Sequence, residues 1–274
     1  MALTLRRCSA PDSEEARDTA MLGLPEPTNF DLRFRLLDIP VRVNPFFWAL
    51  AAYLGWQSHD GFEIFIWVAC VFVSVLVHEF GHGLTARALA NQRPAIVLYY
   101  LGGLCVYERE QRSPGKRIAV LLMGPGAGFL LFAVVAAVGA AAFGFVGFGP
   151  FQWYIHDAPR WSNHVLVQVY MELQMINLIW GVFNLLPIYP LDGGQIANVL
   201  LTMQNRREGP RRGFMLSILV AGGLALWLYQ RGEGYNALIL LMLGLMNLQL
   251  LQAVRYEGRY ATQMDDEDED WWKR

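Results

Sequence analysis

Charged residues are scarce in this chain, and their scarcity argues against an ordinary soluble domain. Only 17% of the 274 residues are Asp, Glu, Lys or Arg, whereas 54% are hydrophobic. Soluble domains average about 25% charged residues. The apolar residues are gathered into runs long enough to cross a bilayer as helices, which indicates an integral membrane protein.

Cysteine is also rare, and its spacing argues against the common cysteine sites. Cys8, Cys70 and Cys105 are far apart and form no CxxC pair. We therefore expect neither a disulfide framework nor a cysteine-based zinc site. The first 30 residues lack the apolar run of a signal peptide, so the first apolar segment is expected to remain in the membrane as an anchor.

Six apolar segments follow one another along the chain, and each is expected to form a membrane helix. They are residues 44–56, 62–90, 117–145, 165–186, 214–229 and 235–254. The predicted fold class is an all-α polytopic membrane protein with about six transmembrane helices. Residues 44–255 are expected to form one membrane domain. It would follow a partly disordered N-terminal segment, residues 1–43, and precede an acidic tail, residues 256–274.

Two stretches depart from the helical pattern. Apolar residues 95–101 and 104–107 flank Gly102-Gly103, which predicts a small membrane-associated β-hairpin after the second helix. The hairpin is too short to span the bilayer. Phe30–Val43 alternates apolar and charged residues, and this pattern is compatible with either a short strand or an interfacial segment.

Basic residues near the helix ends are distributed unevenly. An even number of spans places both termini on one side of the membrane, and that side receives most of the arginines and lysines. The other side receives only Arg160 and Arg231. The positive-inside rule therefore predicts cytoplasmic termini and a multi-pass protein of the cell (inner) membrane.

The second apolar segment carries the chemistry, in the sequence His78-Glu79-Phe80-Gly81-His82. Positions four apart share a helix face, so both histidines can bind one metal ion, and Glu79 can act on a water at that metal. His78 lies about 24 Å along the helix from Phe62, at 1.5 Å per residue. That depth is inside a hydrocarbon core about 30 Å thick, where ionisable groups are costly and indicate function.

A catalytic zinc ion usually has three protein ligands and one open position. Asp192 is the candidate for the third ligand, because it follows the fourth helix after Pro187 and Pro190. Irregular backbone at membrane depth is tolerated where it lines a cavity. Gly193 and Gly194 permit close approach and a turn into a short helix.

These motifs together resemble one known family. His78-Glu79-Phe80-Gly81-His82 is followed by Asn184-Leu-Leu-Pro-Ile-Tyr-Pro-Leu-Asp192-Gly-Gly, and the pair looks like the site-2 protease family of intramembrane zinc metalloproteases. The resemblance covers residues 40 to 255, roughly, and fits the compact bacterial type without PDZ or CBS domains. It implies one zinc ion per chain, held by the two histidines and Asp192. It also implies that Glu79 is the general base and acid.

The same resemblance implies that Asn184 lies near the substrate or the developing oxyanion. The alternative is that Asn184 only bonds backbone groups freed by the two prolines. Members of the family often carry Asn three residues after a Gly-Pro in the third helix, and this chain has Gly128 there. This chain therefore has no Asn side chain at that position.

The function implied is that of a zinc-dependent endopeptidase, which hydrolyses peptide bonds in or near transmembrane segments of membrane-anchored proteins. Its partners would be a membrane-embedded protein substrate and the lipid bilayer, with no nucleic acid. A helical substrate must unwind before cleavage, and the hairpin edge at Val97 and Leu98 is a predicted place for it to add as a strand. Structural cover is the alternative role of the hairpin.

A non-proteolytic membrane zinc-binding protein, such as a transporter or sensor, is the alternative from another functional class. A transporter usually needs ionisable residues along a path across the membrane. In this sequence they are concentrated at one place, with a base beside a ligand, which favours the protease.

Overall fold

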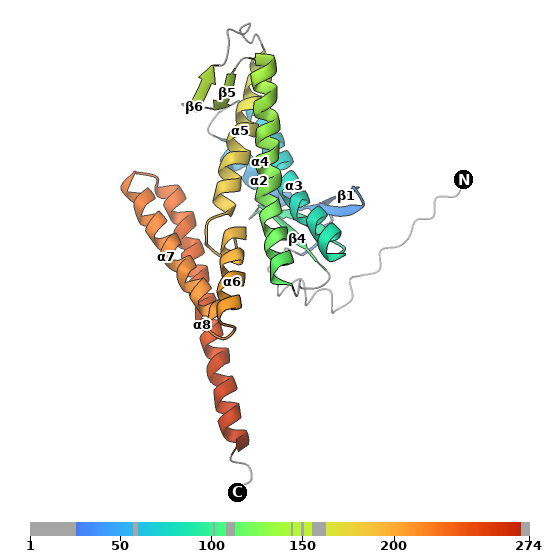
Figure 1. Ribbon diagram of the computed structural model, residues 1–274. Helices are drawn as coiled ribbons and strands as arrows, with labels where there is room; N and C mark the ends of the chain where they lie inside the picture. Colours follow the sequence, from blue (N-terminus) through green and yellow to red (C-terminus); the bar gives the residue numbers. More distant parts are fainter. Residues whose placement is uncertain are drawn as a thin grey trace, which may run out of the picture.

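Seven helices and six strands make up the described part of the chain. The computed structural model describes residues 26–56, 60–100, 102–107, 113–143, 145–148, 151–154 and 163–269 (Figure 1). The helices are α2 (Pro45–Leu54), α3 (Gly61–Ala90), α4 (Pro114–Phe143), α5 (His164–Asn184), α6 (Asp192–Gln204), α7 (Gly209–Gln230) and α8 (Gly234–Glu269). The strands are β1 (Leu32–Leu36), β2 (Ile39–Val43), β3 (Ala95–Tyr99), β4 (Gly102–Val106), β5 (Phe145–Phe148) and β6 (Phe151–Tyr154).

Five helices, α3, α4, α5, α7 and α8, are long and apolar enough to cross a membrane. The predicted class of polytopic helical membrane protein with a small sheet is therefore confirmed. The predicted first span is shorter than expected, because α2 has only 10 residues. A helix of that length measures about 15 Å and does not cross the hydrocarbon core alone.

Local capping explains where the first helices begin and end. Asn44 accepts a hydrogen bond from the Phe46 amide, and Pro45 occupies the first turn of α2. Asp60 caps the start of α3 in the same way, and α3 ends at Asn91, whose left-handed backbone has a φ of 49°. Side-chain caps of this kind satisfy amide groups that have no partner within the helix.

The predicted hairpin is half of a four-stranded sheet with the order β1-β2-β3-β4. β1 and β2 form a second hairpin from the stretch Phe30–Val43, so this stretch forms strands. β2 pairs in parallel with β3.

The prediction that Val97 and Leu98 form an open edge for strand addition by a substrate is wrong. Both residues lie in β3, which is hydrogen-bonded to β2 on one side and to β4 on the other. Among the described residues the edge strands are β1 and β4, because β2 occupies the side of β3 that the sequence left open.

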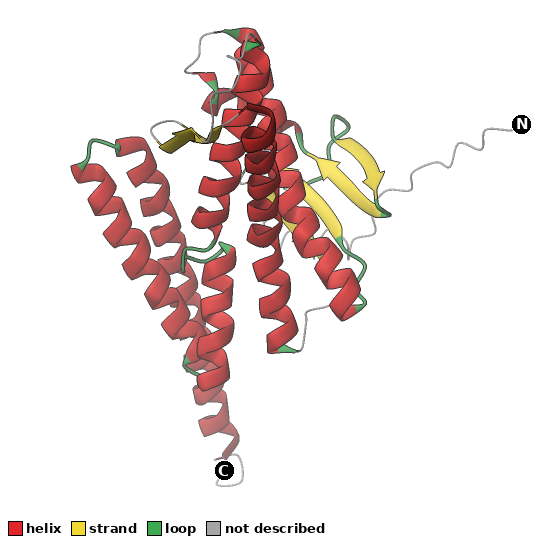
Figure 2. Ribbon diagram, turned by 45° about the horizontal axis from the view of Figure 1, so that its top comes forward, coloured by secondary structure: helices red, strands yellow, loops and turns green. Residues whose placement is uncertain are grey.

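One face of the sheet packs against the middle of α3. Buried residues of β2 and β3 share a hydrophobic core with α3 and α2, namely Ile39, Val41, Val43, Ile96 and Leu98 with Val75, Leu76, Phe80 and Phe47. The sheet therefore lies at the depth of the membrane-spanning helices. The expected domain boundary at residue 43 falls inside this core. Figures 1 and 2 show the sheet on one side of the bundle and α7 with α8 on the other.

The last helix extends beyond the expected membrane segment. α8 continues to Glu269, so the acidic stretch is helical at least to that residue. Its end projects past the other helices (Figure 1). Residues 270–274, and residues 1–25 of the predicted N-terminal segment, lie outside the described residues.

Candidate metal centre

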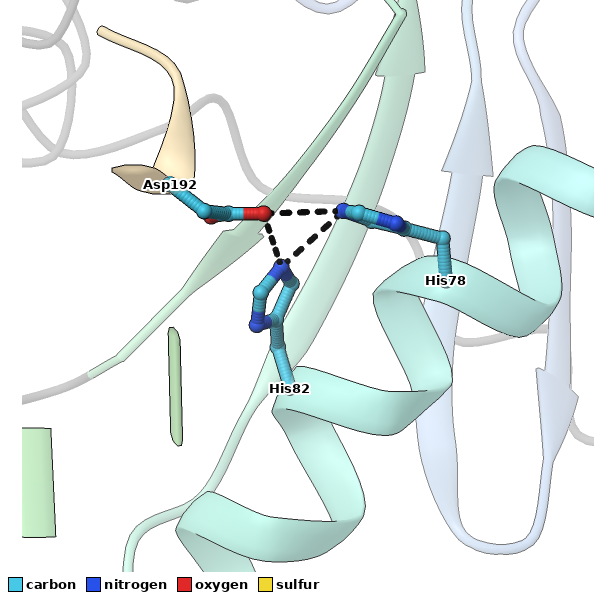
Figure 3. A group of neighbouring side chains, drawn as sticks. All are labelled: His78, His82 and Asp192. Atoms are coloured by element: carbon cyan, nitrogen blue, oxygen red, sulfur yellow. Dashed lines mark hydrogen bonds and ion pairs between the residues drawn. The ribbon is translucent and has the colours of Figure 1, made fainter. Parts of the chain in front are cut away.

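His78, His82 and Asp192 converge on one point between α3 and the start of α6 (Figure 3). The Oδ2 atom of Asp192 lies 3.1 Å from Nε2 of His78 and 3.3 Å from Nε2 of His82. The two Nε2 atoms are 3.2 Å apart. All three side chains are buried, although 114 residues separate His78 from Asp192 in the sequence.

This triangle fits a zinc ion. Zinc bonds to imidazole nitrogen and carboxylate oxygen are about 2.0–2.1 Å long, and a tetrahedral arrangement places such ligand atoms about 3.3–3.4 Å apart. The observed separations of 3.1 to 3.3 Å are close to these values. The ligand set of two histidines and one carboxylate is one that catalytic zinc sites use, with a fourth position open.

The orientation of His82 also favours a cation in the triangle. Its Nδ1 lies 2.8 Å from the carbonyl oxygen of Val120 in α4, so Nδ1 carries the proton and donates it. In a neutral imidazole, Nε2 then presents its lone pair to the Asp192 carboxylate. Two such acceptors at 3.3 Å repel each other unless a metal ion or a second proton on the ring lies between them. The Nδ1 atom of His78 is buried without a hydrogen-bond partner among the described residues.

Two glycines allow α4 to approach the histidine helix closely. A side chain at Gly124 would overlap the ring of His82, and one at Gly81 would overlap the backbone carbonyl of Met123. The helix contact at Gly124 therefore includes a candidate metal ligand itself. The absence of a side chain at Gly124 therefore leaves the space that the His82 ring occupies.

The turn before Asp192 is held in place by the last two helices. The amide of Tyr189 donates to Oγ of Ser217 in α7 at 3.0 Å, and Asn247 in α8 donates to the Tyr189 carbonyl at 2.6 Å. Ser217 is 1% exposed and Asn247 is fully buried. We infer that these two side chains fix the proline-bearing turn and, with it, the position of Asp192. The presence of Ser217 and Asn247 within apolar helices did not reveal this role in the sequence.

Glu79 lies beside the triangle of His78, His82 and Asp192 and against one face of β4, an edge strand of the sheet. It is 4% exposed, and a side chain at Gly103 of β4 would overlap its carboxyl group. One buried place therefore brings together three features. They are the candidate base, the two histidines that flank it along α3, and the edge strand β4.

The scan against family models gives a match to peptidase family M50 over residues 66–228. The chain belongs to this family. The matched region begins inside α3 and ends inside α7, so it contains all three residues of the metal triangle.

Individual relatives of this M50 chain agree with the assignment. It is 29% identical over 180 residues to a Synechocystis protein named as a candidate zinc metalloprotease, covering 65% of this chain and 39% of that one. It is 25% identical over 227 residues to a zinc metalloprotease of Methanocaldococcus jannaschii, covering 81% of this chain and 56% of that one. The chain thus spans about two fifths to just over half of these relatives' lengths.

A solved structure shares the fold. The site-2 protease from Methanocaldococcus jannaschii superposes with a TM-score of 0.53 at 21% identity, over 80% of this chain and 94% of that chain. At this identity the likeness concerns the arrangement of helices and strands.

Two asparagines of α5 form hydrogen bonds near the triangle in this M50 chain, and the sequence singled out only Asn184, not Asn177. Asn184 is buried and donates to the Trp180 carbonyl at 2.9 Å, one turn earlier in α5. The Trp180 ring lies 6.4 Å from the His78 ring. Asn177 donates to Ser74 of α3 at 2.9 Å, and its side-chain oxygen faces Gly128. An amide from α5 therefore lies beside Gly128 of α4.

Proposed function

We propose that this M50 chain is a zinc-dependent intramembrane endopeptidase that hydrolyses peptide bonds in or near membrane-spanning segments of other proteins. One observation supports this most strongly. His78 and His82 of the membrane-spanning helix α3 form a buried triangle with Asp192 of α6, and the buried Glu79 directly follows His78 in α3. One zinc ion per chain would be held by the three side chains of the triangle.

The proposed reaction is hydrolysis of an amide by water. A zinc ion bound there would supply Lewis-acid activation of the water and polarisation of the substrate carbonyl. Glu79 takes a proton from the water and delivers it to the amide nitrogen that leaves. His82 keeps its proton on Nδ1 through Val120, so that its Nε2 stays available as a ligand.

The free edge of β4 is the proposed place for an unwound substrate. Strand addition uses the hydrogen-bonding groups of an unpaired edge, and β4 has such an edge while β3 has none. Gly103 of β4 lies against Glu79, so a peptide paired to β4 would run close to the general base. Backbone N-methylation of a substrate peptide at its strand-forming positions should therefore reduce cleavage. Unchanged cleavage would remove strand addition from the account.

Asn184 is the proposed polar group near the developing oxyanion. Its side-chain nitrogen bonds the carbonyl of Trp180, whose ring lies near His78, so Asn184 occupies the same side of α5 as the metal triangle. The proposed location is the cell (inner) membrane, with both termini in the cytoplasm. Because α2 alone is too short to cross, this orientation requires β2 and α2 together to take the place of the sixth span. In support, Arg87 in the last turn of α3 donates to the Leu37 carbonyl in the turn before β2, and α2 then leads to the start of α3. The basic residues concentrated on one side of the helices support this orientation.

The test uses purified full-length protein, reconstituted in lipid vesicles with a single-span substrate protein. Wild type should cleave the substrate, and Glu79→Gln should retain zinc while losing cleavage by about 10²–10⁴-fold, which is the usual contribution of general acid–base catalysis. A wild type that cleaves no single-span protein but moves zinc across the vesicle membrane would contradict the proposal and favour a transporter.

A further inference from the structure

The indole ring of Trp180 in α5 lies beside both the candidate metal centre and the edge strand β4. Its centroid is 6.4 Å from the centroid of the His78 ring, and the planes of the two rings cross at 73°. A Cβ atom at Gly102, the first residue of β4, would lie 3.0 Å from Cζ2 and Cη2 of the indole. The ring therefore borders the place where the proposed substrate strand meets the proposed zinc ligands.

The nitrogen of this ring is a buried donor without an acceptor. Nε1 of Trp180 has no hydrogen-bond partner among the residues that the structure describes. In an indole, Nε1 is bonded to the same ring carbon as Cζ2, and Cζ2 is one of the two atoms nearest to Gly102. The N–H group therefore lies on the side of the ring that faces the start of β4.

His78 does not supply the acceptor that Trp180 lacks. The Nε2 atom of His78 faces Asp192 in the triangle, so a zinc ligand at this position carries its ring proton on Nδ1 and is a donor there. This Nδ1 is also buried and unpartnered within the described ranges. Two neighbouring rings thus present N–H donors, and both suit an oxygen acceptor that comes from another molecule.

Apolar packing alone does not explain an indole at this position. Burial of an N–H group without a hydrogen bond is costly, and native structures contain few such groups. A phenylalanine at position 180 could stack on Phe183 as the indole does, at a centroid distance of 6.4 Å, and would carry no N–H. A donor kept unpaired beside a reaction centre is expected of a group that is satisfied when the substrate binds.

We propose that the N–H group of Trp180 donates a hydrogen bond to a backbone carbonyl of the substrate, close to the bond that is cleaved. This inference rests on the proposed function and on strand addition to β4. The indole lies against Gly102, whereas the Glu79 carboxyl group lies against the next residue, Gly103. Adjacent residues of a strand are about 3.8 Å apart. A peptide paired to β4 therefore passes the general base and the indole donor within one or two residues.

The test replaces Trp180 with benzothienylalanine, which keeps the size and shape of the side chain but has sulfur in place of N–H. Cleavage of a single-span substrate in lipid vesicles should fall by about 3–10-fold in kcat/KM, the usual contribution of one neutral hydrogen bond. Zinc content, measured on the same samples, should equal that of wild type. The same replacement at Trp227, which is 48% exposed in α7, is the matched control and should leave kcat/KM unchanged.

Three results would overturn the proposal while leaving the proposed function intact. They are a wild-type kcat/KM after replacement of Trp180, an equal loss after replacement of Trp227, and a loss of zinc together with activity after replacement of Trp180. The last result would mean that the ring only supports His78. A wild type that cleaves no single-span protein would contradict the proposed function itself, and this inference with it.

A second measurement does not depend on cleavage. The indole N–H signal of Trp180 in proton–nitrogen NMR spectra is assigned by its loss in Trp180→Phe. In full-length Glu79→Gln, this signal should move downfield when a single-span substrate peptide is added, because the N–H group gains a carbonyl acceptor. A peptide that shifts other signals but leaves this one unmoved would also overturn the proposal.

Discussion

Gly124 of α4 lies directly against the imidazole ring of His82 of α3, and no side chain fits between them. The Val120 carbonyl, one turn earlier in α4, accepts a hydrogen bond from Nδ1 of the same ring. One helix therefore supplies both the space and the hydrogen-bond acceptor that orient a proposed metal ligand on its neighbour. Partners of this kind commonly change metal affinity by 10–100-fold when they are altered.

Gly124→Ala should lower zinc affinity by at least about tenfold, because the added methyl group displaces His82 from the triangle. Zinc affinity is measured by competition with a chromophoric chelator. Gly126→Ala is the matched control, since position 126 has room for a methyl group and alanine favours a helix over glycine. Equal zinc affinities in the two variants would show that the contact at Gly124 is not structurally important.

Gly103→Ala should lower kcat by about 10–100-fold while zinc content stays unchanged, because the methyl group would shift the Glu79 carboxyl group and small misplacements of catalytic groups are costly. The measurement is cleavage of a reconstituted single-span substrate, with zinc determined on the same samples. Gly115→Ala, at a position with no neighbouring atoms, serves as the control. A variant at Gly103 with wild-type kcat would place Glu79 further from β4 than we describe.

Ser217→Ala and Asn247→Leu should each weaken zinc binding by about 10-fold, because they release the Tyr189 backbone that positions Asp192. The double variant should lose less than the sum of the two single effects, since both side chains hold the same residue. Chelator competition measures all three variants. Two results would contradict this account. One is full additivity of the two effects in the double variant, and the other is unchanged zinc affinity in either single variant.

Cys105 should be poorly reactive at neutral pH. Burial and, to a smaller extent, the nearby Glu79 charge raise the pKa of the Cys105 thiol. Alkylation requires the thiolate, so a raised pKa keeps the group neutral and slows the reaction below the pKa. In a Cys8→Ser/Cys70→Ser variant, the alkylation rate of folded protein should still be rising at pH 10. A plateau near the pKa of a free thiol, about 8.5, would contradict this.

The sequence predicted the metal triangle and the helical class because both depend on local regularities. The spacing of His78 and His82 follows directly from the helix repeat, and long apolar runs indicate membrane helices. Asp192 was predictable because prolines and glycines mark an irregular turn after a span. The geometry of the three side chains agrees with that prediction.

Long-range pairing was not predictable in the same way. β2 and β3 are separated by the whole of α2 and α3, and the register between parallel strands has no local signal. As a result, Val97 and Leu98 were placed on an open edge that β2 in fact occupies. Ser217 and Asn247 were missed for a related reason, since a single polar residue in an apolar helix does not identify its partner.

The account rests on one zinc ion bound by residues of α3 and α6, and zinc K-edge X-ray absorption of the purified protein tests it most directly. Wild type should contain about one zinc per chain, with only nitrogen and oxygen neighbours at about 2.0–2.1 Å and the multiple scattering of two imidazoles. Asp192→Ala should reduce the bound zinc or change its coordination. A wild type without zinc, or one with sulfur neighbours at about 2.3 Å, would contradict the account.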